Sequence, residues 1–200
     1  MIKTNTRKSP EHTRQLVLSA TLQLFTEKGY FNTSVRDIAR ESQVSIGSIY
    51  HHFNDKEGVA SAMYNDLLKR MSESLEDIQR NNDSAHERCH AVIELLFKVT
   101  EEEPQLMEFM MYSKHREFLP DEAPICSAQP FMLMREMVAH GMETGEIQNL
   151  DLMVASSCLY GGAIRMITSR LDGIIEKSLL EYVESVWECS WRSIAVNQLV

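Results

Sequence analysis

The chain has 200 residues, of which 44% are hydrophobic, and a formal net charge of −9, so it is long and apolar enough to bury a real core. The longest uncharged stretch, Leu152–Ile164, is too short to span a bilayer, and the basic N-terminus has no apolar signal-peptide segment. The four cysteines, Cys89, Cys126, Cys158 and Cys189, form no C-x-x-C pair, so we expect reduced thiols in a soluble cytoplasmic protein.

Helix signals dominate the chain, and no segment shows the sustained alternation of a strand, so we predict an all-α fold. Ser9 and Pro10 are typical of a helix start and Gly29 of a helix end, which predicts a first helix between them. Ser34, with Asp37 three residues later in capping-box position, predicts a short second helix.

Ser45 predicts a third short helix that runs to about Phe53, and Asn54 or Asp55 begins a long fourth helix. Two short helices in this order form a helix-turn-helix, whose second helix enters the major groove of DNA. We expect this N-terminal three-helix domain in residues 1–56, joined by the long helix to a larger helical domain in residues 57–200. Further helices are predicted at 84–100, 104–118, 130–144, 150–171 and 174–195, with a Pro-rich connection at 120–130.

The overall acidity hides an asymmetry. Residues 1–60 hold 8 Lys and Arg against 6 Asp and Glu, a net of +2, whereas the remaining residues have a net charge of −11. Only the N-terminal part is therefore expected to approach a polyanion such as DNA, because the rest would be repelled by one.

A more specific pattern surrounds the helix-turn-helix. It reads Arg14-x-x-Val17-Leu18-x-Ala20-Thr21-x-x-Leu24-Phe25-x-x-x-Gly29-Tyr30, then Thr33-Ser34-Val35-Arg36-Asp37-Ile38-Ala39, then Val44-Ser45-x-Gly47-Ser48-Ile49-Tyr50-x-His52-Phe53-x-x-Lys56. In order, spacing and residue type, this pattern closely resembles the TetR family of bacterial regulators. The resemblance runs from about Arg14 to Val59, and beyond it only the all-helical layout is shared. It implies a homodimeric DNA-binding repressor whose second domain binds a small effector.

The resemblance also implies which residues contact DNA. Phosphate contacts are expected from Thr33, Ser34, Tyr50, His52 and Lys56, and base contacts from Ser45, Ile46, Gly47, Ser48 and His51. The chemistry agrees, because Tyr50 and His52 offer donors to phosphate oxygens, and Gly47 lets the helix backbone approach the groove. Ile38, Val44, Ile49 and Phe53 are instead expected to pack the core.

Two positions depart from the family pattern. Gln43 occupies a turn position where similar proteins often have Gly, so a left-handed conformation there would cost about 1 kcal/mol. Ile46 stands where relatives often have a polar or basic residue, and it can contact a thymine methyl but cannot hydrogen-bond a guanine.

Methionines concentrate in two predicted helices of the second domain. Flexible thioethers suit a cavity that reshapes around an apolar or amphipathic ligand, although Met also fills ordinary core gaps. The candidate effector residues are Met107, Met110, Met111, Phe131, Met134, Arg135, Met137, Tyr160 and Arg165. Arg135 and Arg165 could orient a polar ligand group, pair with a core carboxylate or extend to solvent.

The spacing of His86, Cys89 and His90 would place all three on one face of a helix, as a transition metal needs. Because Cys89 also continues an apolar stripe and no fourth ligand is visible, we favour a core thiol between surface histidines, and we expect no cofactor.

The last two helices are predicted to form the dimer interface of a four-helix bundle, through Cys158, Gly161, Gly162, Leu179, Val183 and Val186. The alternative is that both helices close the core of one chain.

The sequence thus favours a ligand-responsive repressor that binds a palindromic operator. A second hypothesis is a DNA-bound structural or interaction protein whose second domain recruits a partner protein. No P-loop, G-x-S-x-G, H-E-x-x-H or Gly-rich dinucleotide motif is present, so we do not expect an enzyme.

Overall fold

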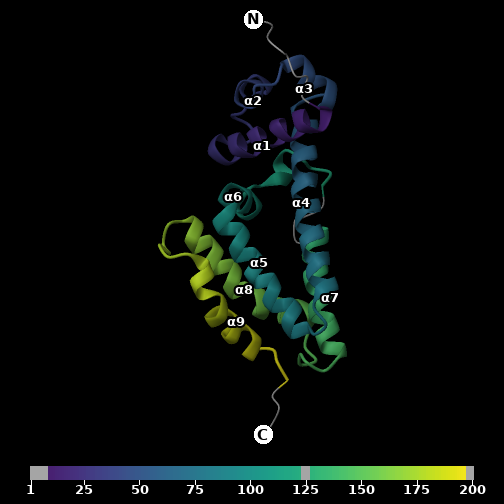
Figure 1. Cartoon of the computed structure of the whole chain (residues 1–200), viewed down its shortest axis with the longest axis vertical. Coiled ribbons are helices and arrows are strands. Elements are labelled where there is room, and N and C mark those ends of the chain that lie inside the picture. The colour runs from purple at the N-terminus through teal and green to yellow at the C-terminus, as the bar shows by residue number, and fades with distance from the viewer. Residues whose placement is uncertain (1–8, 123–126, 197–200) are drawn as a thin grey trace, which may run out of the picture. The chain divides into compact units, whose positions relative to one another are not determined.

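The computed structural model describes residues 9–122 and 127–196, and these residues form helices joined by short connections (Figure 1). Cys126 lies outside the described residues. Two compact units are present: Met1–Leu67 with Tyr112–Glu122, and Leu68–Met111 with Ala123–Val200. No described segment forms a strand beyond an isolated bridge between Ile147 and Ala195, which confirms the all-α prediction. No helix in the described part of the chain has the length and apolarity needed to cross a membrane.

The first unit contains α1 (Pro10–Lys28), α2 (Val35–Ser42), α3 (Ile46–Phe53) and the start of α4 (Lys56–Asn81). Their boundaries follow from the predicted caps. The Ser9 hydroxyl accepts a hydrogen bond from the amide of His12, and Ser34 forms the predicted capping box with Asp37. These bonds satisfy amides that the first turn of a helix leaves without a partner, so the predicted starts of α1 and α2 are confirmed.

The turn between α2 and α3 depends on Gln43, whose φ of 54° lies in the left-handed region. The fold accepts the cost of about 1 kcal/mol because the turn orients α3 against the core. Ile38 and Ile49 are fully buried there, and Val44 and Phe53 are nearly so, which confirms their predicted core role.

The second unit contains the rest of α4 and most of the longer helices. These are α5 (Ala85–Glu102), α6 (Pro104–Tyr112), α7 (Gln129–Glu143), α8 (Leu152–Leu171) and α9 (Val183–Arg192), with a 3-10 turn η3 (Leu179–Tyr182) before α9. Their core is one continuous cluster that includes Leu75, Phe97 and Trp187.

The predicted helix at 104–118 is too long. The observed helix in this region, α6, ends at Tyr112, and a separate 3-10 turn, η1 (His115–Glu117), follows. His115, Phe118 and Leu119 are buried beyond that break. Burial of these side chains in the first unit outweighs the local helix propensity.

The predicted helix at 174–195 is also wrong at its start, because residues 173–178 form an irregular connection. An ion pair holds this connection: the Arg170 guanidinium donates to the Glu101 carboxylate, with a shortest N–O distance of 3.0 Å. Arg170 also donates to the carbonyl of Ile175, and Glu101 accepts from the amide of Leu179. The two side chains satisfy backbone groups that a continuous helix would have bonded to itself.

Replacing Arg170 by Ala is expected to lower the free energy of unfolding by about 1–2 kcal/mol at pH 7, because several charge-assisted bonds are lost together. The hydrogen bond from Arg170 lowers the pKa of Glu101, so this stabilisation is present above the unfolded Glu pKa of about 4.3 and is lost as pH falls below it. Urea unfolding at pH 7 and pH 3.5 measures both effects. Arg192→Ala is the control, since its pair with Glu188 is exposed and should contribute little.

Candidate functional site

Helix α3 presents one polar, exposed face. Ser45, Gly47, His51 and His52 are exposed, and Ile46 and Tyr50 are 39% and 48% exposed. The opposite face, with Ile49 and Phe53, is buried. The Ser45 hydroxyl accepts from the amide of Ser48 at 3.2 Å and thereby fixes the start of the helix. The structure therefore brings the predicted base-contacting residues together on one accessible surface.

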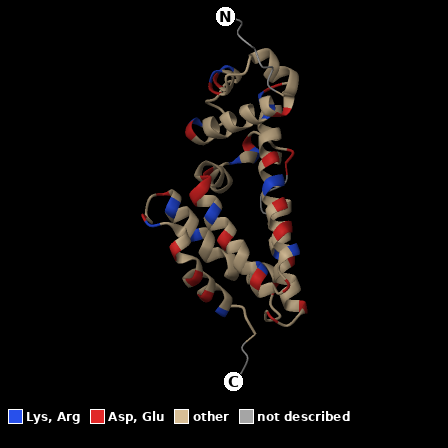
Figure 2. Ribbon diagram, in the orientation of Figure 1, with Lys and Arg blue, Asp and Glu red and all other residues tan. Residues whose placement is uncertain are grey.

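No Lys, Arg, Asp or Glu lies on α3, which is entirely tan in Figure 2. This surface offers hydroxyls, imidazoles and one apolar side chain without a carboxylate of its own to repel phosphate. His51 and His52 lie side by side, with ring centroids 5.5 Å apart.

The start of α2 is the second predicted contact region. Ser34 is exposed, and its hydroxyl both donates to the Asp37 carboxylate and accepts from the Asp37 amide. Hydrogen bonds from Ser34 lower the pKa of Asp37 to about 2. Ser34 is accessible to a phosphate, but a charged Asp37 carboxylate stands beside it.

Thr33 is not placed as predicted. Its side chain is only 2% exposed, and its hydroxyl donates to the carbonyl of Gly29 at 2.9 Å. A small hydroxyl that closes the turn between α1 and α2 is thereby turned away from solvent. We therefore withdraw Thr33 as a phosphate contact through its side chain.

Lys56 is also directed into the protein. Its Nζ donates to the carbonyls of Tyr30 and Thr33 at 3.0 and 3.1 Å, and it lies 3.9 Å from the centroid of the Tyr30 ring. Burial lowers the pKa of Lys56. Two of its three N–H groups are used to hold the turn before α2, a role that the sequence analysis missed.

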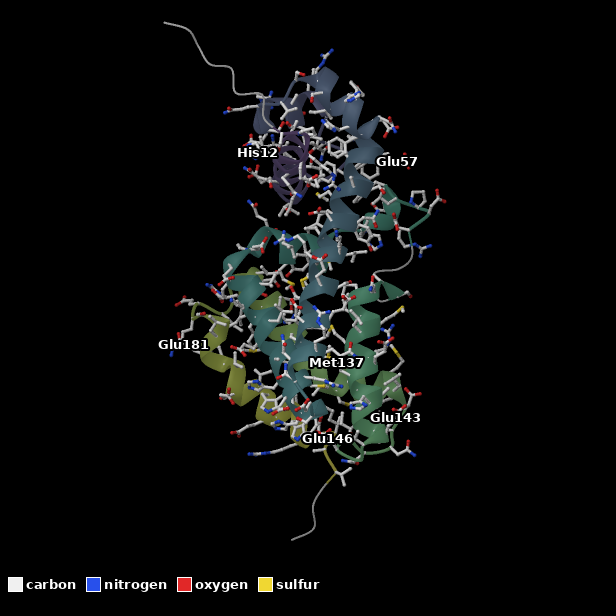
Figure 3. All side chains as sticks on the ribbon, turned by 45° about the vertical axis from the view of Figure 1, so that its right-hand side comes forward. His12, Glu57, Met137, Glu143, Glu146 and Glu181 are labelled. Carbon is white, nitrogen blue, oxygen red and sulfur yellow. The ribbon has the colours of Figure 1, made fainter. Side chains whose placement is uncertain are left out.

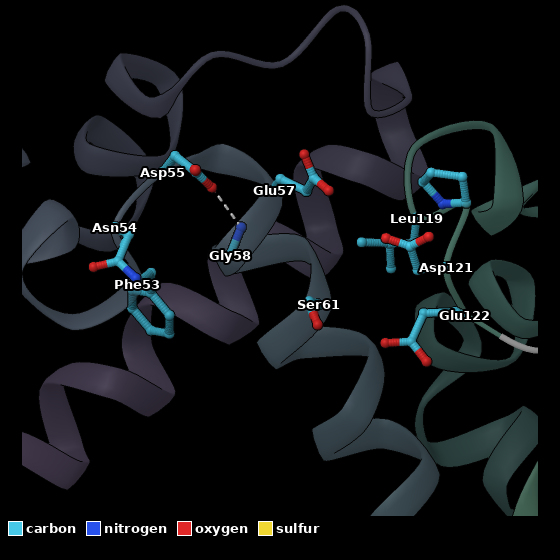
Figure 4. Close-up of a pocket in the computed structure, with 10 residues that line it drawn as sticks. Phe53, Asn54, Asp55, Glu57, Gly58, Ser61, Leu119, Asp121 and Glu122 are labelled. Atoms are coloured by element: carbon cyan, nitrogen blue, oxygen red, sulfur yellow. Dashed lines mark hydrogen bonds between the residues drawn. The ribbon is translucent and has the colours of Figure 1, made fainter.

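An acidic hollow of about 390 Å³ lies where α3 meets α4, next to the Leu119–Glu122 segment of the same unit (Figure 4). Four carboxylates line it, from Asp55, Glu57, Asp121 and Glu122. Asp55 is already bonded to the amide of Gly58 at 2.7 Å. This hollow would repel a phosphate backbone, so it is not part of the candidate DNA-contacting surface on α2 and α3.

The predicted effector residues mostly fall in the core of the second unit. Met107, Met134, Met137 and Tyr160 are buried in one cluster, with Met111 packed against it, and Met137 is labelled on α7 in Figure 3. Met110 is buried outside this cluster, and Phe131 and Arg135 are half-buried. Arg165 is exposed on α8, so its expected contact with a buried ligand is not supported.

Three buried hydroxyls in this unit lack a good partner in the described part of the chain. The hydroxyls of Ser72 and Ser156 form no hydrogen bond with the described residues. The Tyr160 hydroxyl faces the Cys89 thiol, which is a weak hydrogen-bonding group. Burial raises the pKa of Tyr160 well above its usual value. Buried hydroxyls of this kind normally find a partner in water or in a ligand.

His86 and His90 share an edge-on contact with Trp187, whereas Cys89 lies in the core. Cys89 is fully buried, where burial raises its pKa to about 11. His86 packs edge-on against Trp187 and Trp191, and His90 lies 3.0 Å from a Glu184 carboxylate oxygen. Within residues 9–122 and 127–196, no three His, Cys, Asp or Glu side chains are placed to hold a metal ion.

A second hollow, of about 650 Å³, lies beside His86. Its walls are His86, Thr144, Gly145, Glu146, Trp191, Ala195 and Val196. None of the predicted effector residues is among them.

The predicted dimerisation residues divide into two sets. Leu179 and Val183 are 0% and 8% exposed in the core of a single chain, so they are not free to contact a partner; this part of the prediction is wrong because η3 and the start of α9 close that core. Cys158 and Gly162 are exposed, and Gly161 and Val186 are half-buried.

The exposed set continues along α8. Val154, Cys158, Gly162 and Arg165 follow one another at spacings of three or four residues, and Met153 is 56% exposed beside them. A Cβ added at Gly161 would meet no atom within 4 Å, and one at Gly162 would meet only the Ser190 hydroxyl at 3.8 Å. Close packing within the chain therefore does not explain these two glycines.

Comparisons with known proteins cover both units. Residues 17–63 match the family of bacterial regulatory proteins called tetR, and residues 64–196 match the tetracyclin repressor-like C-terminal domain. The HTH-type transcriptional regulator HbdR of Aromatoleum sp. (strain CIB) is 34% identical over 83 residues, which are 41% of this chain and 36% of that protein. The fatty acid metabolism regulator protein of Bacillus subtilis (strain 168) is 22% identical over 183 residues, 86% of this chain and 90% of that protein.

Two solved structures are similar over most of the chain. The fatty acid degradation regulator FadR from Bacillus halodurans aligns with a TM-score of 0.76 and 20% identity, covering 88% of this chain and 97% of that one. FadR from Bacillus subtilis in complex with stearoyl-CoA aligns with a TM-score of 0.75 and 20% identity, covering 88% and 96%. At this identity the likeness shows a shared fold.

Proposed function

We propose that this chain, which belongs to the TetR family of bacterial regulatory proteins, is a repressor that binds a palindromic DNA operator as a homodimer and releases it when an amphipathic small molecule binds. The observation that carries the proposal is the exposed face of α3, which offers hydroxyl, imidazole and apolar groups without a carboxylate. The net charge of +2 in residues 1–60 supports the approach of this unit to DNA.

The structure refines the proposed roles in DNA binding. Ser34, Tyr50 and His52 remain candidates for phosphate contacts because all three are exposed. Ser45, Ile46, Gly47, Ser48 and His51 remain candidates for contacts with base edges. Lys56 is reassigned to holding the turn before α2, since its ammonium is bonded to two carbonyls there.

Selection of bound fragments from a random DNA pool tests the proposed function, and a palindromic enriched site is the expected result. Tyr50→Phe should then weaken binding about 10-fold to every sequence alike, because a hydrogen bond to a charged phosphate is lost. Ile46→Ser should instead change the base preferred at one position of each half-site. If Tyr50→Phe altered base preference and Ile46→Ser did not, these roles would be reversed.

The proposed dimer uses the exposed stripe of α8. Its small and apolar side chains, with the space left at Gly161 and Gly162, allow the α8 helix of a second copy to approach closely. A dimer is needed because one eight-residue helix such as α3 reads only a few base pairs.

The proposed effector has a long apolar chain and a polar head. The Met-rich core of the second unit suits an apolar chain, and the unpartnered hydroxyls of Ser72 and Ser156 suit polar atoms of the head. Two FadR proteins are similar over most of this chain, and one of them was solved with stearoyl-CoA. A fatty acyl thioester is therefore the first ligand class to test.

A further inference from the structure

The connection between α6 and α7 contributes to the DNA-binding unit although it is distant from that unit in sequence. Residues Tyr112–Glu122 group with the helix-turn-helix, whereas α7 and nearly all of α6 belong to the second unit. This teal segment lies beside the start of α4 in Figure 1. Three of its side chains, from His115, Phe118 and Leu119, are buried.

Phe118 contacts Phe25 of α1 and Tyr30 in the turn that follows it. Its ring stacks on that of Tyr30, with centroids 4.5 Å apart and planes inclined by 10°. The Phe25 ring completes the cluster, inclined by 66° to the Phe118 ring with centroids 6.1 Å apart. Because Phe118 is 9% exposed, it has no surface of its own for DNA.

Lys56 contacts the same Tyr30 ring. Its ammonium lies over the ring, 3.9 Å from the centroid. Tyr30 therefore contacts both an aromatic ring and a cation, and both contacts are attractive.

Tyr30 also fixes the backbone of the turn before α2. The Tyr30 carbonyl accepts from Lys56 at 3.0 Å and from the amide of Thr33 at 3.2 Å, and Lys56 donates as well to the Thr33 carbonyl. Ser34, the exposed cap of α2, follows directly in the chain. Motion of the Tyr30 ring would thus be transmitted to the first turn of α2.

A second stacked pair anchors the connection to α4. The His115 ring lies on the Tyr64 ring, with centroids 4.8 Å apart and planes inclined by 17°. His115 and Tyr64 are both buried, so their contact holds the segment that carries Phe118 against α4.

We infer that Phe118 is a positioning residue for DNA binding, which holds the turn before α2 through Tyr30 and Lys56. The inference rests on the proposed DNA binding and adds a residue from the second half of the chain to it. Phe118 follows α6 in the chain and belongs to the same compact unit as the turn before α2.

Phe118→Leu tests the inference, since it keeps an apolar side chain of similar size and removes the stacked ring. In the full-length protein, amide hydrogen exchange at Thr33 and in the first turn of α2 is expected to become about 5- to 30-fold faster. Affinity for the DNA site selected by the wild-type protein should fall by a similar factor on every sequence, with an unchanged salt slope, because no charge is removed.

Two variants serve as controls. Phe97→Leu makes the same change at a fully buried position of α5 in the second unit, and it should leave exchange in the turn before α2 as in the wild type. Tyr30→Phe keeps the ring and should also retain wild-type exchange, whereas Tyr30→Leu should reproduce the effect of Phe118→Leu.

The outcomes separate this inference from the proposed function. Wild-type exchange at Thr33 together with wild-type DNA affinity in Phe118→Leu overturns the inference. If the wild-type protein enriches no DNA, the proposed function is wrong, and the exchange rates alone decide whether Phe118 holds the turn.

Discussion

Replacing Gly162 by Arg is expected to leave a folded monomer that binds its operator at least about 100-fold more weakly than the wild-type protein. Gly162 lies on the exposed stripe of α8, and a Cβ there has ordinary room within one chain. A charged side chain would therefore be accepted by the monomer but would block close approach of a second α8. Loss of one of two half-sites removes several kcal/mol of specific binding, because each contacted base pair contributes about 1–3 kcal/mol.

Sedimentation equilibrium and operator titration measure the two effects on the same samples. Met132→Arg is the matched control, because it places the same charge at an exposed apolar position of α7 in the same unit. A Gly162→Arg protein that remained dimeric and bound the operator normally would show that α8 is not the interface.

Stearoyl-CoA is expected to lower operator affinity by about 5- to 150-fold, equivalent to a coupling of about 1–3 kcal/mol. Linkage requires the operator to weaken stearoyl-CoA binding by the same factor, because both ligands act on one conformational equilibrium. Titrating the ligand against the protein with and without operator measures this coupling. Equal ligand affinity in the two titrations would remove stearoyl-CoA as the effector, and an absence of binding would exclude this ligand class.

Replacing Ser156 tests whether its hydroxyl takes part in binding stearoyl-CoA. This hydroxyl is buried and has no protein partner in the described residues, so Ser156→Ala should leave stability unchanged or raised while weakening stearoyl-CoA binding about 5- to 10-fold. Thr100→Val is the control, since the Thr100 hydroxyl is buried too but is already bonded to the carbonyl of Leu96 at 2.7 Å. If Ser156→Ala bound stearoyl-CoA as tightly as the wild type, Ser156 would have no part in the site.

Local signals in the sequence were sufficient for the starts of α1, α2 and α3. Ser9, Ser34 and Ser45 each bind an amide of the helix that they precede, at separations of three residues along the chain. The family resemblance likewise marked Gln43 as a turn residue, and its φ lies in the left-handed region. Such features are predictable because both partners of each hydrogen bond lie within one turn of the chain.

The tertiary structure decided the features whose partners are far apart in the sequence. Tyr30 and Phe118 are 88 positions apart, and their stacking accompanies the early end of α6. The pair of Arg170 with Glu101, 69 positions apart, fixes the irregular segment before α9. Helical periodicity could not reveal either contact, because it reports which face of a helix is apolar and not which distant residue covers it.

The same limit explains why the tertiary structure changed several assigned roles. Leu179 and Val183 belong to an apolar stripe that could have faced a second copy, and only packing within one chain placed them in its core. Lys56 has the charge that a phosphate contact needs, yet its ammonium is directed to the carbonyls of Tyr30 and Thr33. The sequence by itself determined the helical class, the caps and the polar face of α3, since these depend on near neighbours. Only the tertiary structure decided which side chains remain accessible, because accessibility depends on the sum of contacts from the whole fold.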